Sequence, residues 1–184
     1  MLLRPLLCCR KVELEDYLST LGQQWREDES NLDTDFTRNR IRHQLLPLLK
    51  NDFQPSVEES LLNLAELAGQ TQQYLRHHAG ELAARAVTVA GDDQQETVTV
   101  DLSALVAVPP LVVREMLVET WCQQDWPRQA MGMRQWNQLL EMTQEERSPG
   151  SQTFPGDVRA VRVEKKSGGQ LRLTRRLGNL KSGD

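Results

Sequence analysis

The sequence has no apolar run near the length that a membrane-spanning helix requires. Of its 184 residues, 39% are hydrophobic and 26% are charged, whereas a span needs roughly 20 consecutive apolar residues. Arg4 and Pro5 interrupt the apolar opening at residues 1–7, and neither a signal-peptide core nor a small-residue cleavage site follows. We therefore expect a soluble, cytoplasmic chain with no membrane partner.

Cysteine and aromatic residues are also scarce. The three cysteines are an odd number and have no CxxC spacing, which excludes a disulfide scaffold and favours reduced thiols. His77 and His78 are adjacent, so we expect them to point to different sides of a helix, and we predict no metal site. Aromatic residues make up 5% of the chain, too few for an extended base-stacking surface.

Basic and acidic residues are unevenly distributed along the chain, and basic residues are scarce in its middle part. Residues 1–50 hold 8 basic and 8 acidic residues, residues 51–156 hold 6 and 15, and residues 157–184 hold 8 and 3. The net charges are therefore zero, −9 and +5, within a total of −4. Such asymmetry indicates segments with different partners. The basic tail could bind nucleic acid, or it could form a strand face that is exposed to solvent and binds nothing.

Most of the chain has apolar residues at helical spacing. The pattern predicts helices over residues 12–21, 36–49, 55–87, 111–124 and 131–142. Pro47 is expected to kink or shorten the second helix. Residues 25–33 are polar and have no periodicity, so they predict a loop.

Alternating residues predict a small sheet. Residues 96–101 form one expected strand, and residues 158–163 and 171–173 form a hairpin with a turn at 167–169. The apolar phase shifts by one residue after Ala160, which predicts a β-bulge. The fold class is therefore mainly α with a small antiparallel β-sheet (α+β).

The segment richest in chemistry is an acidic loop followed by arginines. Residues 27–35 contain five carboxylates, and Arg38, Arg40 and Arg42 follow on the next helix. Arg38 and Arg42 are four residues apart and share a helix face, while Arg40 points elsewhere. Two guanidinium groups on one face can bind a phosphate or a carboxylate. A structural ion-pair network between loop and helix is the alternative, and composition alone favours that alternative.

The order of several motifs resembles that of the tRNA(Ile)-lysidine synthases. The resemblance rests on residues 3–68, and beyond them the likeness is architectural: a long helix, a short strand, two helices and a hairpin. The motifs are Leu3-Arg4-Pro5-Leu6-Leu7, Trp25-Arg26-Glu27-Asp28-Glu29-Ser30-Asn31, Arg38-Asn39-Arg40-Ile41-Arg42-His43 and Leu46-Pro47-Leu48.

This resemblance implies a ligase that modifies tRNA. The family uses ATP to adenylate the wobble cytidine of an isoleucine tRNA, and the amine of free lysine then displaces AMP to give lysidine. The implied cofactor is ATP with Mg²⁺, and the implied partners are tRNA, free lysine and ATP. A homodimer is a possible assembly.

The resemblance also assigns roles to residues beside the family's active site. Arg38 and Arg42 are the expected catalytic residues, in contact with phosphate or substrates, because arginine stabilises developing phosphate charge. Asp28, Ser30 and Asn31 are expected to order the loop. Together with Asn39 they are the expected substrate-binding residues. Arg40 and His43 are expected to approach RNA, with a local hydrogen bond as the alternative for His43.

The basic hairpin offers a second candidate surface. Phosphate contacts there predict strong salt dependence and little sequence specificity. A solvated hairpin without a ligand is the alternative. The candidate nucleic-acid-binding residues are Lys165, Lys166, Arg172, Arg175 and Arg176.

One family motif does not occur in this sequence. The Ser-Gly-Gly-x-Asp-Ser loop, whose backbone amides hold pyrophosphate in the family, is absent, so we expect a C-terminal portion that is inactive alone. Residues 1–53 are the expected end of an ATP-pyrophosphatase-type catalytic domain, 54–156 a helical substrate-recognition domain, and 157–184 a hairpin with a basic tail. The alternatives are a stand-alone tRNA-binding module and a helical interaction protein that assembles through the helix at 55–87.

Overall fold

The chain forms two compact units, Met1–Leu64 and Ala65–Asp184. The computed structural model describes residues 3, 5–6, 9–26, 28–92, 94–144, 150–163 and 169–176. Helices dominate, and one five-stranded antiparallel sheet accompanies them, which confirms the predicted α+β class. Within the described ranges, no helix has both the length and the apolar character needed to cross a bilayer.

The first unit is a series of short helices. Its elements are α1 (Lys11–Thr20), the 3₁₀ turn η1 (Glu29–Leu32), α2 (Thr37–Arg40), the π-helical turn η2 (Ile41–Leu45) and α3 (Leu46–Asp52). The Glu13 carboxylate caps α1 by accepting the backbone N–H of Arg10 at 2.8 Å. Gly22, with φ of +66°, takes the left-handed conformation just past the end of α1, where glycine commonly ends a helix.

Pro47 explains the turn in the middle of the second predicted helix. Proline has no N–H to donate to the carbonyl four residues earlier, and its ring crowds that carbonyl. The helix widens just before it: Leu46 donates its N–H to the carbonyl of Ile41, five residues back. The helix is not shortened at Pro47, since α3 continues to Asp52, and the proline follows a π turn.

Almost no side chain is buried in the part of the first unit that the structure describes. Asn39 is the only buried residue among those described up to residue 64. The apolar residues of the predicted helix at 36–49 lie on one side at Ile41, Leu45, Leu48 and Leu49; the first three are each more than 40% exposed, and Leu49 is half-buried. A helix face of this kind is normally covered, so hydrophobic burial does not hold the described part of this unit together.

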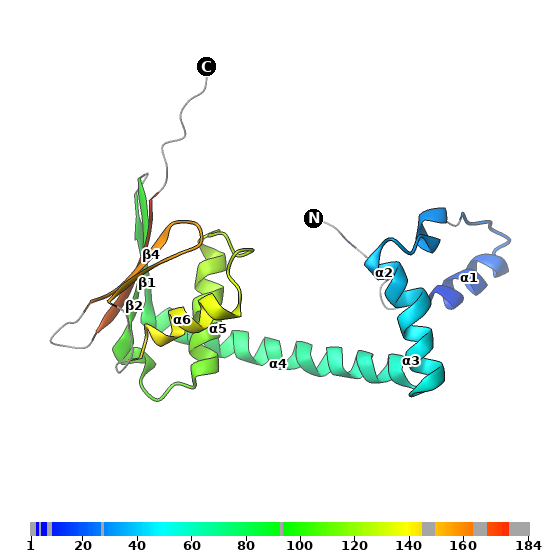
Figure 1. Ribbon diagram of the computed structural model, residues 1–184, viewed down its shortest axis with the longest axis horizontal. Helices are drawn as coiled ribbons and strands as arrows, with labels where there is room; N and C mark the ends of the chain where they lie inside the picture. The colour runs from blue at the N-terminus through cyan, green and yellow to red at the C-terminus, as the bar shows by residue number, and fades with distance from the viewer. Residues whose placement is uncertain are drawn as a thin grey trace, which may run out of the picture. The chain divides into compact units, whose positions relative to one another are not determined.

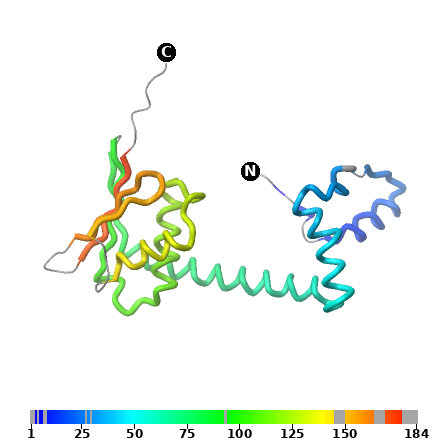
Figure 2. Tube along the Cα trace, in the orientation of Figure 1, coloured from blue at the N-terminus to red at the C-terminus, as the bar shows by residue number. Residues whose placement is uncertain are grey.

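The second unit is built on the sheet. Helix α4 (Val57–Ala86) carries the chain into it, and the spatial order of the strands is β1-β2-β5-β4-β3. The strands are β1 (Val87–Gly91), β2 (Gln95–Asp101), β3 (Ser151–Phe154), β4 (Val158–Val163) and β5 (Gln170–Arg176). Figure 2 shows the green β2 beside the red β5, which are far apart in sequence and pair antiparallel over their whole length.

Two helices lie on one side of this sheet, α5 (Pro110–Gln123) and α6 (Met133–Glu141) (Figure 1). The core between the layers contains the last turns of α4, through Ala79 and Leu82, and the inner strand residues Leu171 and Leu173. Trp121 is fully buried at the centre of this core. Its ring lies edge-on to the rings of three further residues, Trp126, Trp136 and Phe154, at centroid distances of 5.0–6.4 Å.

Two strands are absent from the sequence-based prediction. The chain leaves α4 at Ala86 and continues as β1, where the β-branched residues Val87, Thr88 and Val89 suit an extended backbone. These residues pair with β2 in a regular antiparallel register. The short β3 extends the other edge of the sheet by pairing with β4.

The predicted β-bulge after Ala160 is wrong. The pairing of β4 with β5 runs without interruption from Arg159 to Val163. The apolar phase breaks because Arg162 occupies an inward-facing position at the end of the strand. Its guanidinium donates to the carbonyls of Met142 and Gln144, at 3.3 and 2.9 Å, just past the end of α6. The predicted hairpin is present, although residues 167 and 168 of its turn lie outside the described residues.

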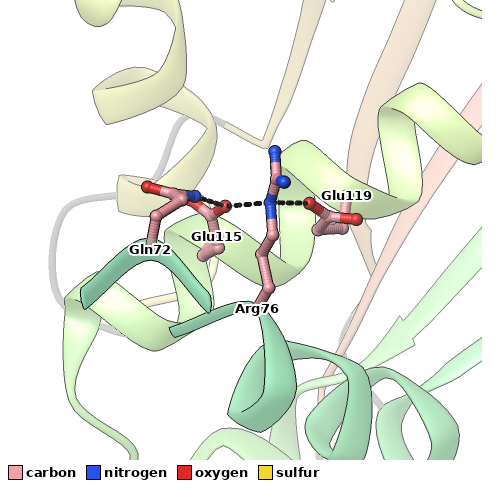
Figure 3. Close-up of polar contacts among 4 residues, drawn as sticks. All are labelled: Gln72, Arg76, Glu115 and Glu119. Atoms are coloured by element: carbon pink, nitrogen blue, oxygen red, sulfur yellow. Dashed lines mark hydrogen bonds and ion pairs between the residues drawn. The ribbon is translucent and has the colours of Figure 1, made fainter. Parts of the chain in front are cut away.

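A polar cluster holds α4 against α5 (Figure 3). Arg76 of α4 forms ion pairs with Glu119 at 3.0 Å and with Glu115 at 3.8 Å. Gln72, one turn earlier on α4, donates its amide to the carboxylate of Glu115. The two glutamates are four residues apart on α5, so one face of each helix supplies the contact.

Packing of α4 into the core leads to a direct test. We expect Leu82→Ala to lower the free energy of unfolding of the second unit by about 2–5 kcal/mol, because this 1% exposed side chain would leave a cavity. Urea denaturation followed by tryptophan fluorescence measures the loss. Leu67→Ala is the matched control in the same helix: Leu67 is 62% exposed, and the change should stay within about 0.5 kcal/mol. Equal losses for the two variants would contradict this packing.

Candidate functional site

The acidic loop of the first unit is ordered by its own short side chains. Asp28 precedes η1, and its Oδ1 accepts the backbone N–H of Ser30 at 2.9 Å. The backbone carbonyl of Asp28 also accepts the N–H of Asn31 at 3.0 Å. At the other end Asp33 accepts the N–H of Asp35 at 2.9 Å. The predicted loop is therefore confirmed, with a 3₁₀ turn inside it that the sequence analysis did not predict, and local Asx-type bonds fix its backbone.

Asn39 fastens this loop to the helix. Its side chain is buried, and the amide Nδ2 donates to the carbonyl of Ser30 at 2.8 Å and to that of Asp33 at 2.7 Å. Both amide hydrogens are thus used within the protein. Any contribution of Asn39 to substrate binding acts through the position of the loop.

His43 provides a second attachment, one helical turn further on. Its Nε2 lies 2.9 Å from the backbone carbonyl of Asn31. A carbonyl oxygen only accepts, so Nε2 carries the proton in this contact. The local hydrogen bond considered as the alternative for His43 is therefore present.

The electrostatics of the loop keep Asp28 ionised. Hydrogen bonds from the Ser30 hydroxyl and then from the Ser30 backbone N–H hold the pKa of the Asp28 carboxyl below its ordinary value. The positive charge of Arg38 acts in the same direction and is a smaller cause. The loop therefore presents an acceptor that stays negative under ordinary conditions.

The arginines of the same helix remain at the surface. Arg38 lies over the ring of Phe36, with 5.3 Å from its guanidinium carbon to the ring centroid. Arg40 is exposed and reaches the Thr37 hydroxyl at 3.4 Å. Arg42 is exposed.

The ion-pair alternative finds no support in the described part of this unit. No carboxylate described there lies within ion-pair distance of Arg38, Arg40 or Arg42. Two side chains of this helical segment, those of Asn39 and His43, bind the loop through its backbone carbonyls. The guanidinium groups of its three arginines stay accessible to solvent. Accessible guanidinium groups beside an ordered acidic loop can bind an anionic oxygen bidentately.

The described basic residues of β5 lie on both faces of the sheet. Arg172 and Arg176 are exposed on the face away from the helices, whereas Arg175 alternates to the other face, opposite Glu96 of β2. Glu96 itself accepts the indole N–H of Trp126 at 2.6 Å. Lys165 and Lys166 lie outside the described residues.

The histidine pair on α4 behaves differently from the prediction. Both rings reach one carboxylate: His77 Nε2 lies 3.4 Å and His78 Nδ1 lies 3.1 Å from the two oxygens of Glu81. The expectation that the two side chains point apart is wrong, because residues three and four apart on a helix are neighbours. In the described ranges, no three His, Cys, Asp or Glu side chains are grouped to hold a metal ion.

Comparison with known proteins identifies the first unit. The family model of the PP-loop domain matches residues 1–49, which contain the whole loop-and-arginine site. The tRNA(Ile)-lysidine synthase of Solibacter usitatus is 38% identical over 117 residues, which are 63% of this chain and 26% of that protein. The chain belongs to the tRNA(Ile)-lysidine synthase family. This confirms the resemblance seen in the sequence motifs.

Other tRNA(Ile)-lysidine synthases match a larger share of the chain. That of Pseudomonas putida is 34% identical over 126 residues, 67% of this chain and 28% of that protein. That of Vibrio parahaemolyticus is 27% identical over 161 residues, 86% of this chain and 34% of that protein. The chain thus spans between about a quarter and a third of the length of these tRNA(Ile)-lysidine synthases.

The buried amide of Asn39 generates a prediction about the loop. Asn39→Ala removes the side-chain donor to the carbonyls of Ser30 and Asp33, of which Ser30 keeps the backbone N–H of Asp33, so the loop should lose about 1–3 kcal/mol of local stability. Amide hydrogen exchange at Asn31 and Asp33 measures this loss as faster exchange. Asn63→Ala, at an exposed asparagine of α4, is the matched control and should leave these two rates unchanged. Unchanged exchange in the Asn39 variant would show that the loop is held by other contacts.

Proposed function

We propose that this chain takes part in the ATP-dependent ligation of lysine to the wobble cytidine of an isoleucine tRNA. One observation carries the proposal: the acidic loop is anchored by Asn39 and His43, while the neighbouring arginines stay exposed. Family membership supports the chemistry, since the relatives are tRNA(Ile)-lysidine synthases.

The reaction in this family has two steps that involve phosphate charge. The wobble cytidine first attacks the α-phosphate of ATP and releases pyrophosphate. The amine of lysine then forms the new carbon–nitrogen bond, and AMP leaves. In our proposal Arg38 and Arg42 bind the phosphate oxygens on which charge develops, and Arg40 contacts the RNA.

The loop residues act by position in this proposal. Asp28, Ser30 and Asn31 form the rim that substrates meet, and the low pKa of Asp28 keeps an acceptor beside the arginines. Asn39 and His43 hold this rim through backbone carbonyls of Ser30, Asp33 and Asn31. They are positioning residues, because both act through the loop.

The domain assignment remains part of the proposal. Residues 1–53 would be the end of the catalytic domain, 54–156 the substrate-recognition domain, and 157–184 the hairpin with its basic tail. The PP-loop match to residues 1–49 supports the first assignment. Because β4 and β5 share one sheet with β1 and β2, the hairpin would act together with the recognition domain.

ATP is the cofactor that the family implies, with Mg²⁺ as its usual companion. The residues that the structure describes include no carboxylate or histidine group arranged for a metal. We therefore assign no Mg²⁺ ligand and derive no step through the ion. The arginines are the groups of this chain that suit a nucleotide phosphate.

Binding of tRNA is the experiment that tests the proposed function. Residues 1–184 should bind isoleucine tRNA with an affinity that falls as salt rises, because phosphate contacts release counterions. Arg42→Gln should weaken binding severalfold and reduce the slope of log affinity against log salt by about one. Lys50→Gln, at an exposed cation of α3, is the control and should change neither value. A helical interaction protein without RNA function would show no affinity even at low salt.

Catalysis by residues 1–184 alone is a separate prediction. We expect no pyrophosphate release from ATP with lysine and isoleucine tRNA, because the sequence contains no Ser-Gly-Gly-x-Asp-Ser loop. The Solibacter usitatus enzyme is the positive control. Measurable release by the purified chain would contradict this prediction, whereas tRNA binding without release also fits a stand-alone tRNA-binding module.

A further inference from the structure

The sheet of the second unit has one face that no described element covers. Helices α5 and α6 lie on the other face (Figure 1). Burial alternates accordingly along β5: Leu171 and Leu173 are buried in the core, and Arg172 between them is exposed. We call the face away from the helices the outer face of the sheet.

Three arginines from two strands meet on this outer face. Arg159 of β4 lies directly opposite Thr174 of β5, and Arg172 and Arg176 lie two residues to either side of Thr174. Diagonal neighbours of this kind are roughly 7–8 Å apart, and four strand residues span roughly 13 Å at about 3.3 Å per residue. All three side chains line one open depression of about 870 Å³, together with Thr153 and Thr174.

These arginines have no acidic partner among the described residues. Asp157 is the single carboxylate in the lining of the depression, and the other polar lining groups are threonine hydroxyls and the amide of Gln95. Arg162 differs from them, since it points inward and caps the end of α6. The outer face therefore presents three guanidinium groups whose charge is not neutralised by neighbours in the described structure.

The outer face is also poor in groups that read bases. None of its described residues is aromatic, because the rings of Trp121, Trp126, Trp136 and Phe154 are all buried in the core. Single-stranded RNA is usually bound by stacking its bases on exposed rings. Paired RNA is instead recognised through its phosphates and 2′-hydroxyls, which arginine and threonine can contact.

We propose that the outer face binds the sugar–phosphate backbone of a base-paired RNA stem, with Arg159, Arg172 and Arg176 on successive phosphates. The inference rests on the proposed function, which supplies tRNA as the RNA, and it specifies the surface and the part of the molecule bound. Arg172 and Arg176 lie roughly 13 Å apart along β5, a distance that fits several phosphates in a row and exceeds the size of a single phosphate group. Arg159 was not among the nucleic-acid-binding residues predicted from sequence, and Arg175 does not belong to this face.

The test compares RNA binding by residues 1–184 with and without the three charges. The variant Arg159→Gln/Arg172→Gln/Arg176→Gln should bind isoleucine tRNA and a short RNA duplex roughly tenfold more weakly, with the salt slope lowered by about 2–3. The wild type should prefer the duplex to a single strand of equal length. Filter binding over a series of salt concentrations measures all of these values.

Two further variants control for folding and for total charge. Arg128→Gln/Arg134→Gln removes two exposed arginines elsewhere in the second unit and should leave duplex binding nearly unchanged. Replacement of the three outer-face arginines by lysine should retain most of the binding, because the charge remains. Circular dichroism should give the same spectrum for all variants.

Several outcomes would overturn the inference. These are wild-type affinity of the triple glutamine variant, an equal loss in the Arg128/Arg134 control, and tighter binding of single strands than of duplex. Binding to phosphatidylglycerol vesicles without binding to RNA would assign the face to a membrane instead. If the wild type binds tRNA and the triple variant binds equally well, only this inference fails. If the wild type binds no tRNA at low salt, the proposed function fails and the inference fails with it.

Discussion

The pairing of β2 with β5 is the constraint on which the second unit depends. These strands lie on either side of α5, α6, β3 and β4 in the sequence, so their ladder closes a long loop and joins two hairpins into one sheet. Closing such a loop costs conformational entropy that only later contacts offset. The burial of Val98, Val100, Leu171 and Leu173 on one side provides that offset, and the same alternation places the arginines on the other side.

The first unit is stabilised in another way. The one side chain buried among its described residues is polar, and hydrogen bonds from Asn39 and His43 to backbone carbonyls join the loop to the helix. Such bonds contribute modestly on balance, but they are directional and fix geometry closely. A site that needs a defined arrangement of exposed charges can therefore be built where little apolar surface is buried.

Sequence periodicity predicted the helices well, because residues spaced three to four apart are buried along α5 and in the last turns of α4, at Ala79, Leu82 and Ala86. It did not predict β1 and β3, which are short edge strands paired with their sequence neighbours β2 and β4. Neither has a clear inward-facing apolar alternation: β1 follows α4 directly, and Phe154 is the only buried residue of β3. Arg162 misled the reading of β4 because its charge is satisfied by carbonyls past the end of α6. For the site, the motif at residues 38–43 indicated which residues belong to it. Only the structure distinguished Asn39, which binds the loop, from the exposed arginines.

The π turn at Ile41–Leu45 holds one residue more than an α-helix would need there. The turn behaves as a one-residue insertion that is absorbed within the helix, so α3 keeps roughly the orientation it would have if the helix were continuous. Deleting one residue after His43 would allow an ordinary α-helix and leave α3 roughly in place. The π turn therefore governs the directions of the side chains inside it, Arg42 and His43 among them, rather than the direction of the helix that follows.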